Sequence, residues 1–420
     1  MRCVLWDADP STGQETTLSQ TTSRQRHCMI VYALYPLGET RVQREAKALI
    51  RRGYAVDVIC LRSTGQPAQD EHHGVRIYRE HYRFPFIGQQ EGLAGRFLNY
   101  LCFFGAAMRR LNQLHHSHPY NTIQVHNLPD FLVFCALVPK RQGTPVILDL
   151  HDLMPEFYIG RFGHKHRWLL HLIRWQERAA CCFADHIITV SEHWRQALIS
   201  RGVPLEKCSV VMNVADDHIF HMPPEGPVMR SAEGELRLIY HGTIVYRYGL
   251  DLAIYAVAQV CDEIPGIHLT ILGEGEAVPT LARLVQDLGL QAHVTIRNEL
   301  RPAEELPDII RQADLGIVPY RNDVFTDGLV PTKLMEYAAL GLPAIASRTT
   351  AIETYFGDTM VELFTPGDVN DLAAAIRRLY CDRARRAQLA NGCLTFNARY
   401  QWCKISADYV ALVEQLGTLT

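Results

Sequence analysis

The chain has 420 residues, with 42 lysines and arginines against 45 aspartates and glutamates. This length exceeds what one hydrophobic core usually supports, so we expect two domains of about 200 residues each. The balanced charge excludes a bulk electrostatic attraction to nucleic acid or anionic lipid, and any basic surface must be local.

Residues 1–26 are polar and lack the apolar core of a signal peptide, so we expect a disordered leader there. The 12 cysteines include no CxxC pair, which favours reduced thiols in a cytoplasmic protein. The longest apolar block, at 97–108, is shorter than the roughly twenty residues that a membrane-spanning helix needs. The sequence therefore predicts a chain that does not cross a bilayer.

Apolar runs with strand character alternate with helical patterns along the first half of the chain. The first pair is a strand at 28–34 and a helix at about 41–52, which Gly53 ends. Further strands are expected at 55–60, 122–126, 145–149 and 186–190. Because strands and helices alternate, they should form a parallel sheet with crossover helices.

The same rhythm restarts near Arg237. Strands are expected at 237–241, 268–272, 293–296, 315–318 and 344–346, with helices at 250–261, 278–288, 303–312 and 369–380 and a terminal helical tract at about 383–416. The predicted fold class is therefore α/β, with two Rossmann-like, doubly wound parallel-sheet domains facing across a cleft. We expect the first domain at 27–220, a proline-rich linker at 221–235, the second domain at 236–395 and a terminal tract at 396–420.

The segment 331–343 places Lys333 and Glu336 one turn apart at a predicted helix start, with Pro331 as the first helical residue. Free amides and the dipole at a helix N-terminus favour a diphosphate, to which Lys333 adds positive charge. The Glu336 carboxylate can accept hydrogen bonds from both hydroxyls of a ribose. One nucleotide-sugar would satisfy both side chains, and the alternative is a surface ion pair on an ordinary amphipathic helix.

Four segments of the sequence resemble, in this order, the landmarks of glycosyltransferase family 4. They are 149–156 (DLHDLMPE), 184–192 (ADHIITVSE), 240–251 (YHGTIVYRYGLD) and 331–343 (PTKLMEYAALGLP), and the similarity extends over about 27–390. The resemblance implies the GT-B fold and transfer of a sugar from a nucleotide-sugar with retention of anomeric configuration. It also implies that neither a metal nor another cofactor is needed.

The donor half of the site departs from the family pattern in its charged residues. The family places two basic residues after the first strand of the second domain, where this chain has Thr243 and Tyr248. We assign their role to the neighbouring Arg247, because fixed cations stabilise a departing diphosphate; the alternative is a solvated loop arginine. The family also places a carboxylate against the donor sugar, and Gly328 stands at that position, with Asp327 as a substitute.

Backbone groups and glycines complete the predicted donor site. The amides of Gly328, Leu329 and Val330 precede the helix and can bind phosphate or sugar. Gly242 and Gly273 follow predicted strands and should lie near the same crevice, although a plain turn also explains Gly273.

Three side chains of the first domain are predicted catalytic residues. His126 ends a strand and resembles the histidine that family members place beside the donor sugar, although a lone histidine is often structural. His151 and Asp152 end the next strand and should orient or deprotonate the acceptor hydroxyl. Glu156 is expected to share the acceptor site, and the alternative is that Asp152 and Glu156 cap a helix.

Gly38 and Arg41 follow the first strand and are expected to contact the acceptor, with Arg41 pointing into the cleft as a second cation. We expect no metal, because the histidines show no paired ligand spacing and Asp7-Ala8-Asp9 lies in the leader.

Basic and aromatic residues mix between Arg79 and Arg110, which suits a peripheral contact with a membrane that carries a lipid-linked acceptor. The alternative is a partly buried helix on the first sheet.

The sequence thus predicts a retaining glycosyltransferase that uses a nucleotide-sugar donor and a sugar or lipid-linked acceptor, in cell-envelope polysaccharide or glycolipid assembly. Two alternatives remain open at this stage. A GT-B nucleotide-sugar 2-epimerase shares the architecture and needs no acceptor. A non-catalytic nucleotide-sugar-binding protein would explain the uncharged residues at 243, 248 and 328.

Overall fold

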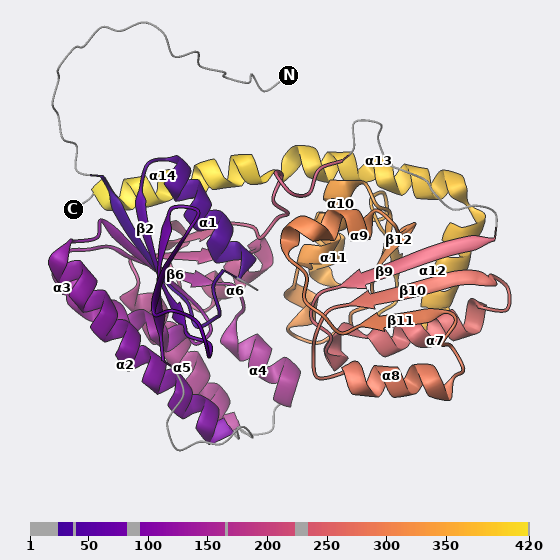
Figure 1. The fold of residues 1–420 in the computed structure, drawn as a ribbon, viewed down its shortest axis with the longest axis horizontal. Coiled ribbons are helices and arrows are strands. Elements are labelled where there is room, and N and C mark those ends of the chain that lie inside the picture. Colours follow the sequence, from indigo (N-terminus) through magenta and orange to yellow (C-terminus); the bar gives the residue numbers. More distant parts are fainter. Residues whose placement is uncertain (1–23, 37–38, 82–92, 164–166, 223–233, 419–420) are drawn as a thin grey trace, which may run out of the picture.

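The computed structural model describes residues 24–36, 39–81, 93–163, 167–222 and 234–418. It contains two separate, predominantly parallel β-sheets flanked by helices (Figure 1). The predicted α/β class with two doubly wound units is therefore confirmed. Among the helices within these ranges, none combines the length and apolarity needed to cross a membrane.

The first sheet has the strand order β3-β4-β2-β1-β5-β6-β7-β8, and only the β3–β4 pair is antiparallel. Its strands are β1 Arg26–Ile30, β2 Ala55–Leu61, β3 Gln69–His72, β4 Val75–Glu80, β5 Thr122–His126, β6 Val146–Leu150, β7 His186–Thr189 and β8 Cys208–Val210. The first strand ends earlier than predicted, and the sequence analysis missed β3, β4 and β8. The edge strand β3 is polar and mostly exposed, so no apolar alternation marks it.

Helices cover both faces of this sheet. They are α1 Thr40–Arg51, α2 Leu93–Ser117, α3 Leu137–Arg141, α4 Met154–Phe162, α5 Arg167–Phe183 and α6 Glu192–Ser200, with 3₁₀ helices η1 Asp130–Ala136 and η2 Leu205–Lys207. Met29 of β1 packs in the cluster that includes α1, whereas its neighbours Cys28 and Ile30 pack with α2 and α5. Successive strand residues point to opposite faces, so α1 lies on one face and α2 and α5 on the other.

The second sheet has the order β11-β10-β9-β12-β13-β14, and its paired neighbours are parallel. Its strands are β9 Glu235–His241, β10 Gly266–Leu272, β11 Val294–Arg297, β12 Leu315–Val318, β13 Ala344–Ser347 and β14 Glu362–Phe364. Its helices are α7 Leu250–Val260, α8 Val278–Asp287, α9 Leu306–Ile310, α10 Thr332–Leu340, α11 Thr350–Tyr355 and α12 Val369–Cys381, with 3₁₀ helices η3 Tyr246–Tyr248, η4 Ala303–Glu305 and η5 Thr326–Gly328.

The terminal helical tract consists of two helices that connect the domains. α13 Arg383–Arg399 packs on α10, and α14 Trp402–Thr418 returns to the first domain and packs on α1 (Figure 1). The hydroxyl of Tyr409 in α14 donates a buried hydrogen bond to Gln124 Oε1 in β5 at 2.7 Å. The carboxylate of Asp217 accepts hydrogen bonds from the amides of Trp402 and Cys403 at 2.8 and 2.9 Å. These bonds cap the start of α14 and hold it against the segment that leaves the first domain.

Candidate active site

A cavity of about 480 Å³ lies between the two domains. The first domain contributes His151, Asp152, Val190 and Asn213 to its wall. The second domain contributes Leu306 of α9 and residues that end or follow β9, follow β12 or lie at the start of α10, namely His241, Gly242, Thr243, Tyr248, Tyr320, Leu329, Val330, Pro331, Thr332, Lys333, Met335 and Glu336. Because it lies at carboxyl ends of parallel strands and has the size of a small-molecule cleft, it is the candidate active site.

The N-terminus of α10 opens into this cavity. Pro331 is the N-cap in an extended conformation (φ −67°, ψ 124°), so the helix begins at Thr332, one residue later than predicted. No side chain caps the helix, and Thr332 lines the cavity. The first amides and the positive dipole end are therefore available to an anion.

Lys333 is buried among tyrosine rings in the cavity wall. Its Nζ donates to the Tyr320 hydroxyl at 2.6 Å and lies 4.9, 5.2 and 5.1 Å from the ring centroids of Tyr240, Tyr248 and Tyr320. Tyr248 stacks on Tyr320 with centroids 4.3 Å apart. Burial lowers the pKa of Lys333 to about 8, so the ammonium gains from an anionic partner. The rings of Tyr240, Tyr248 and Tyr320 thus form an aromatic cage around Lys333. The sequence did not predict this cage, because Tyr248 stood out only as a position where the family has a basic residue.

Glu336 lies one turn further along α10 and also lines the cavity. Burial raises its pKa to about 7, while Arg44 and Lys333 oppose this shift by their positive charge. His241 Nε2 lies 3.2 Å from Glu336 Oε2, outside hydrogen-bond alignment. Burial, followed by the charge of Lys333, lowers the pKa of His241 to about 3, so its imidazole is neutral. The structure thus brings Lys333 and Glu336 to one cavity wall, as predicted.

Arg247 lies beside the cavity rather than in its wall. Its guanidinium is 5.4 Å from the ring centroid of Phe157 in the first domain and 4.9 Å from that of Phe325 in the second. The Nη1 atom is buried and has no hydrogen-bond partner. Burial raises the pKa of Asp152, and the charges of His151 and Arg247 oppose that shift. Arg247 is thus not a solvated loop arginine, and its role toward the donor stays a prediction.

Gly242 lines the cavity, whereas Gly273 does not line it and packs against the backbone of Gly242. A Cβ on Gly273, where φ is +143°, would lie 1.9 Å from the carbonyl oxygen of Gly242. Only glycine permits this approach of two loops, so Gly273 shapes the donor side without lining the cavity.

Two predicted donor residues do not reach the cavity. The Asp327 carboxylate accepts a hydrogen bond from the amide of Thr350 at 2.9 Å, which corrects its proposed role against the sugar. Gly328 is buried against the first domain, and a Cβ there would lie 2.5 Å from Trp194 Cη2 and 2.6 Å from His193 Cδ2. Neither residue lines the cavity. The position at which the family has a carboxylate is thus packed between the domains in this chain.

His126, Asp149 and His151 form one connected group at the end of β5 and β6. His126 Nδ1 lies 3.1 Å from both His151 Nε2 and Asp149 Oδ2, and His151 Nε2 lies 3.4 Å from Asp149 Oδ2. His126 is fully buried and is not among the residues that line the cavity, and its contact with the donor sugar stays a prediction. His151 is the member that reaches the cavity.

Arg41 is a buried partner of Asp149 and does not point into the cleft as predicted. Its Nε and Nη2 atoms both donate to the carboxylate at 3.0 Å, and Nη1 donates to the carbonyl of Val211 at 2.7 Å. The charges of Arg41 and then His151, with hydrogen bonds from His126 and His151, overcome burial and hold the pKa of Asp149 well below its usual range. Gly38 lies outside the described residues.

Glu156 is also buried, and it pairs with Arg201 rather than with the cavity or the start of α4. Arg201 also donates to Glu177 at 2.8 Å, so the three side chains form an internal network. The predicted acceptor role of Glu156 is therefore wrong, and so is the alternative of a helix cap.

One group of potential metal ligands occurs among the described residues, and it is again His126, Asp149 and His151. Both carboxylate oxygens of Asp149 already accept hydrogen bonds from Arg41. A cation bound here would have to compete with that guanidinium.

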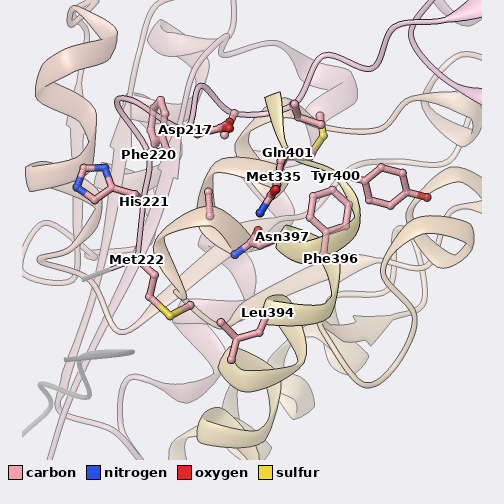
Figure 2. A pocket seen from close by; sticks show the side chains of 13 residues that line it. Asp217, Phe220, His221, Met222, Met335, Leu394, Phe396, Asn397, Tyr400 and Gln401 are labelled. Atoms are coloured by element: carbon pink, nitrogen blue, oxygen red, sulfur yellow. The ribbon is translucent and has the colours of Figure 1, made fainter. Parts of the chain in front are cut away.

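A second cavity, of about 240 Å³, lies at the hinge between the domains (Figure 2). Phe220 and Met222 of the connecting segment face Leu394, Phe396 and Tyr400 at the α13–α14 junction. Asp217 is the only charged residue in its wall, and α14 engages its carboxylate as described above. This cavity suits a structural hinge rather than a polar substrate.

Two facing Rossmann-like domains with an interdomain cleft are the GT-B arrangement. Residues 38–213 match the family described as glycosyl transferase 4-like domain, and residues 235–382 match glycosyl transferases group 1. The chain belongs to the GT-B glycosyltransferases of family 4, as the sequence motifs indicated.

Sequence relatives bear names of the same class. The chain is 26% identical over 389 residues to D-inositol 3-phosphate glycosyltransferase from Thermobispora bispora, covering 86% of each chain. It is 26% identical to the sulfoquinovosyl transferase SQD2 of Arabidopsis thaliana, with 65% of this chain and 52% of that protein covered. It is 29% identical to a GDP-mannose-dependent phosphatidylinositol monomannoside mannosyltransferase of Mycolicibacterium smegmatis, with coverage of 54% and 61%. The chain thus spans little more than half the length of these last two relatives.

Solved structures support the fold. Sucrose-phosphate synthase from Thermosynechococcus elongatus superposes with a TM-score of 0.77 at 21% identity, over 94% of this chain and 100% of that one. Anabaena HepE in complex with UDP-glucose gives 0.68 at 16% identity, over 93% and 100%.

Proposed function

We propose that the protein transfers a sugar from a nucleotide-sugar to an acceptor hydroxyl, with retention of anomeric configuration and without a metal. The observation that carries the proposal is the uncapped start of α10, which presents Lys333 and Glu336 to the interdomain cavity. A diphosphate at a helix N-terminus and a ribose on a carboxylate match the two halves of a nucleotide.

The donor site would stabilise the leaving nucleoside diphosphate. As the bond between the sugar C1 and the phosphate oxygen breaks, negative charge grows on that oxygen. Lys333 in the cavity wall is one candidate cation, and Arg247, whose buried Nη1 atom has no hydrogen-bond partner, is the other. In a buried site, such fixed charges favour the transition state over the bound ground state. The neutral His241 and the carboxyl group of Glu336 would face the ribose hydroxyls.

The acceptor would approach from the first domain. Its hydroxyl oxygen forms the new bond to C1 on the face from which the diphosphate departs, which retains configuration. The hydroxyl proton passes to the departing phosphate oxygen, and His151 orients the hydroxyl. Asp149 and His126 fix the His151 ring from behind, and Arg41 fixes Asp149. Since Arg41 occupies the Asp149 carboxylate, this group serves a hydrogen-bond network better than a metal site.

A lipid-linked acceptor at the cytoplasmic face of a membrane fits this proposal, in cell-envelope polysaccharide or glycolipid assembly. The mannosyltransferase relative carries a phosphatidylinositol monomannoside acceptor in its name. Relatives named as transferases favour transfer over epimerisation or non-catalytic binding.

The test is a matrix of nucleotide-sugars and acceptors, read by proton NMR and product mass. A glycosylated acceptor with the donor's anomeric configuration, formed in the presence of EDTA, supports the proposal. Epimerised donor without acceptor would replace it with the epimerase. Tight nucleotide binding with no turnover across the panel would replace it with a binding protein.

A further inference from the structure

The helix α5 exposes a large apolar ridge on the outer side of the first domain. Trp168, Leu172 and Trp175 follow one another at the spacing of one helix face and are 69%, 50% and 68% exposed. The opposite face of α5 buries Leu170, Ile173, Ala180 and Cys181. Two tryptophans this exposed are not needed for the core, so the ridge is available to a partner.

The exposed charged side chains of α5 itself are all positive. Arg167, Arg174 and Arg178 are exposed on α5. The only acidic residue of the helix is Glu177, which is buried and accepts hydrogen bonds from Arg201 at 2.8 Å. Although the chain has a net charge of −3, the helix that carries Trp168 and Trp175 exposes only positively charged side chains.

A cavity of about 580 Å³ adjoins the ridge, between α5 and the segment that follows α6. Arg174, Arg178, Arg201 and Lys207 line it, and Glu177 is the only acidic residue in its wall. Its size and charge suit a phosphate-bearing headgroup.

The position of α5 connects this surface to the active site. α4 begins directly after the cavity residues His151 and Asp152 and packs against α5 (Figure 1). On the other side of α5, η1 packs against both α5 and α2. Phe97 and Leu101 of α2 are also exposed, and they lie within the segment predicted to meet a membrane.

We propose that this outer face of α5 docks on a membrane containing anionic phospholipid. Tryptophans with a cationic border are the side chains that bind at the interface of such a bilayer. A second copy of the chain is a poorer occupant, because a symmetric pairing of this face would bring the arginines of both copies together. The inference rests on the proposed function in one respect: docking would bring a lipid-linked acceptor to His151.

Flotation of the full chain with phosphatidylglycerol–phosphatidylcholine vesicles tests the proposal. The wild-type chain should float with these vesicles, less so with pure phosphatidylcholine and less so at high salt. The variant Trp168→Ser/Trp175→Ser should lower the partition coefficient by about tenfold or more, and Arg174→Glu/Arg178→Glu by a similar factor. Tryptophan emission of the wild-type chain should shift to the blue with vesicles.

Matched controls separate this surface from general effects. Leu300 is 53% exposed and Arg283 is exposed in the second domain, so Leu300→Ser and Arg283→Glu should float like the wild-type chain. Flotation unchanged by the α5 variants would overturn the proposal, as would concentration-dependent dimerisation that only these variants abolish. Flotation measures vesicle binding and does not require sugar transfer. A failure of the proposed transferase activity can therefore be distinguished from a failure of membrane docking.

Discussion

The Nζ atom of Lys333 lies 2.6 Å from the hydroxyl oxygen of Tyr320, and three tyrosine rings surround the ammonium. This contact fixes a partly desolvated cation at the start of α10. A cation held in place in a buried site needs little reorganisation when a diphosphate arrives. We therefore expect the aromatic rings around Lys333 to compensate in part for the family cations that Thr243 and Tyr248 replace.

Replacing Tyr320 by Phe should weaken nucleoside diphosphate binding by about threefold to tenfold, because one hydrogen bond that holds Lys333 is lost. Isothermal titration calorimetry measures this change. Tyr337→Phe is the matched control, since its buried hydroxyl donates to the carbonyl of Ile239 at 3.1 Å and not to Lys333. Equal losses of affinity in both variants would contradict the role of Tyr320.

Nucleotide affinity should depend on pH with a maximum between about 7 and about 8, the pKa values of Glu336 and Lys333. Ribose binding requires ionised Glu336, so affinity should rise as pH rises through about 7. Diphosphate binding favours protonated Lys333, so affinity should fall as pH rises above about 8. Glu336→Gln should remove the acid limb and Lys333→Arg the basic limb. A flat profile for the wild-type chain would argue against both assignments.

Replacing His151 by Asn should lower kcat by about 10²-fold or more while leaving nucleotide affinity within a factor of about two. The ring reaches the acceptor half of the cavity, and the donor contacts come from the other domain. His268→Asn, on β10, is the control and should retain activity. A His151 variant that loses nucleotide affinity instead of kcat would place this histidine in the donor site.

Substitution of Gly328 by Ala should destabilise the contact between domains, by about 1–3 kcal/mol if the rings of Trp194 and His193 must shift. Small-angle scattering should report a larger radius of gyration, and the melting temperature should fall. Gly105→Ala is the control, because a Cβ there meets nothing within 4 Å and φ is not positive. Unchanged compactness and melting in Gly328→Ala would contradict the packing of this position between the domains.

The sequence predicted the two sheets because buried parallel strands are short apolar runs separated by helices. The strand at 122–126 and the helix start near Lys333 were found for this reason. The C-terminal helix α14 was not assigned to the first domain, because its attachment depends on tertiary contacts such as Tyr409 to Gln124.

The positions of side chains in the cavity were predictable only where the backbone alone set their direction. Lys333 and Glu336 follow from the helix start, and His151 from a strand end. Arg41 and Glu156 stand at similar positions, but Asp149 and Arg201 draw them into buried ion pairs. No local pattern reveals such partners, since they are distant in sequence.

The central claim is that the start of α10 holds a nucleoside diphosphate through Lys333 and Glu336. Calorimetry of the wild-type chain, Lys333→Ala and Glu336→Ala against a panel of nucleoside diphosphates tests it most directly. We predict that each variant loses about 1.5–3 kcal/mol of binding free energy toward the preferred diphosphate. Affinities equal to that of the wild-type chain in both variants would contradict the account.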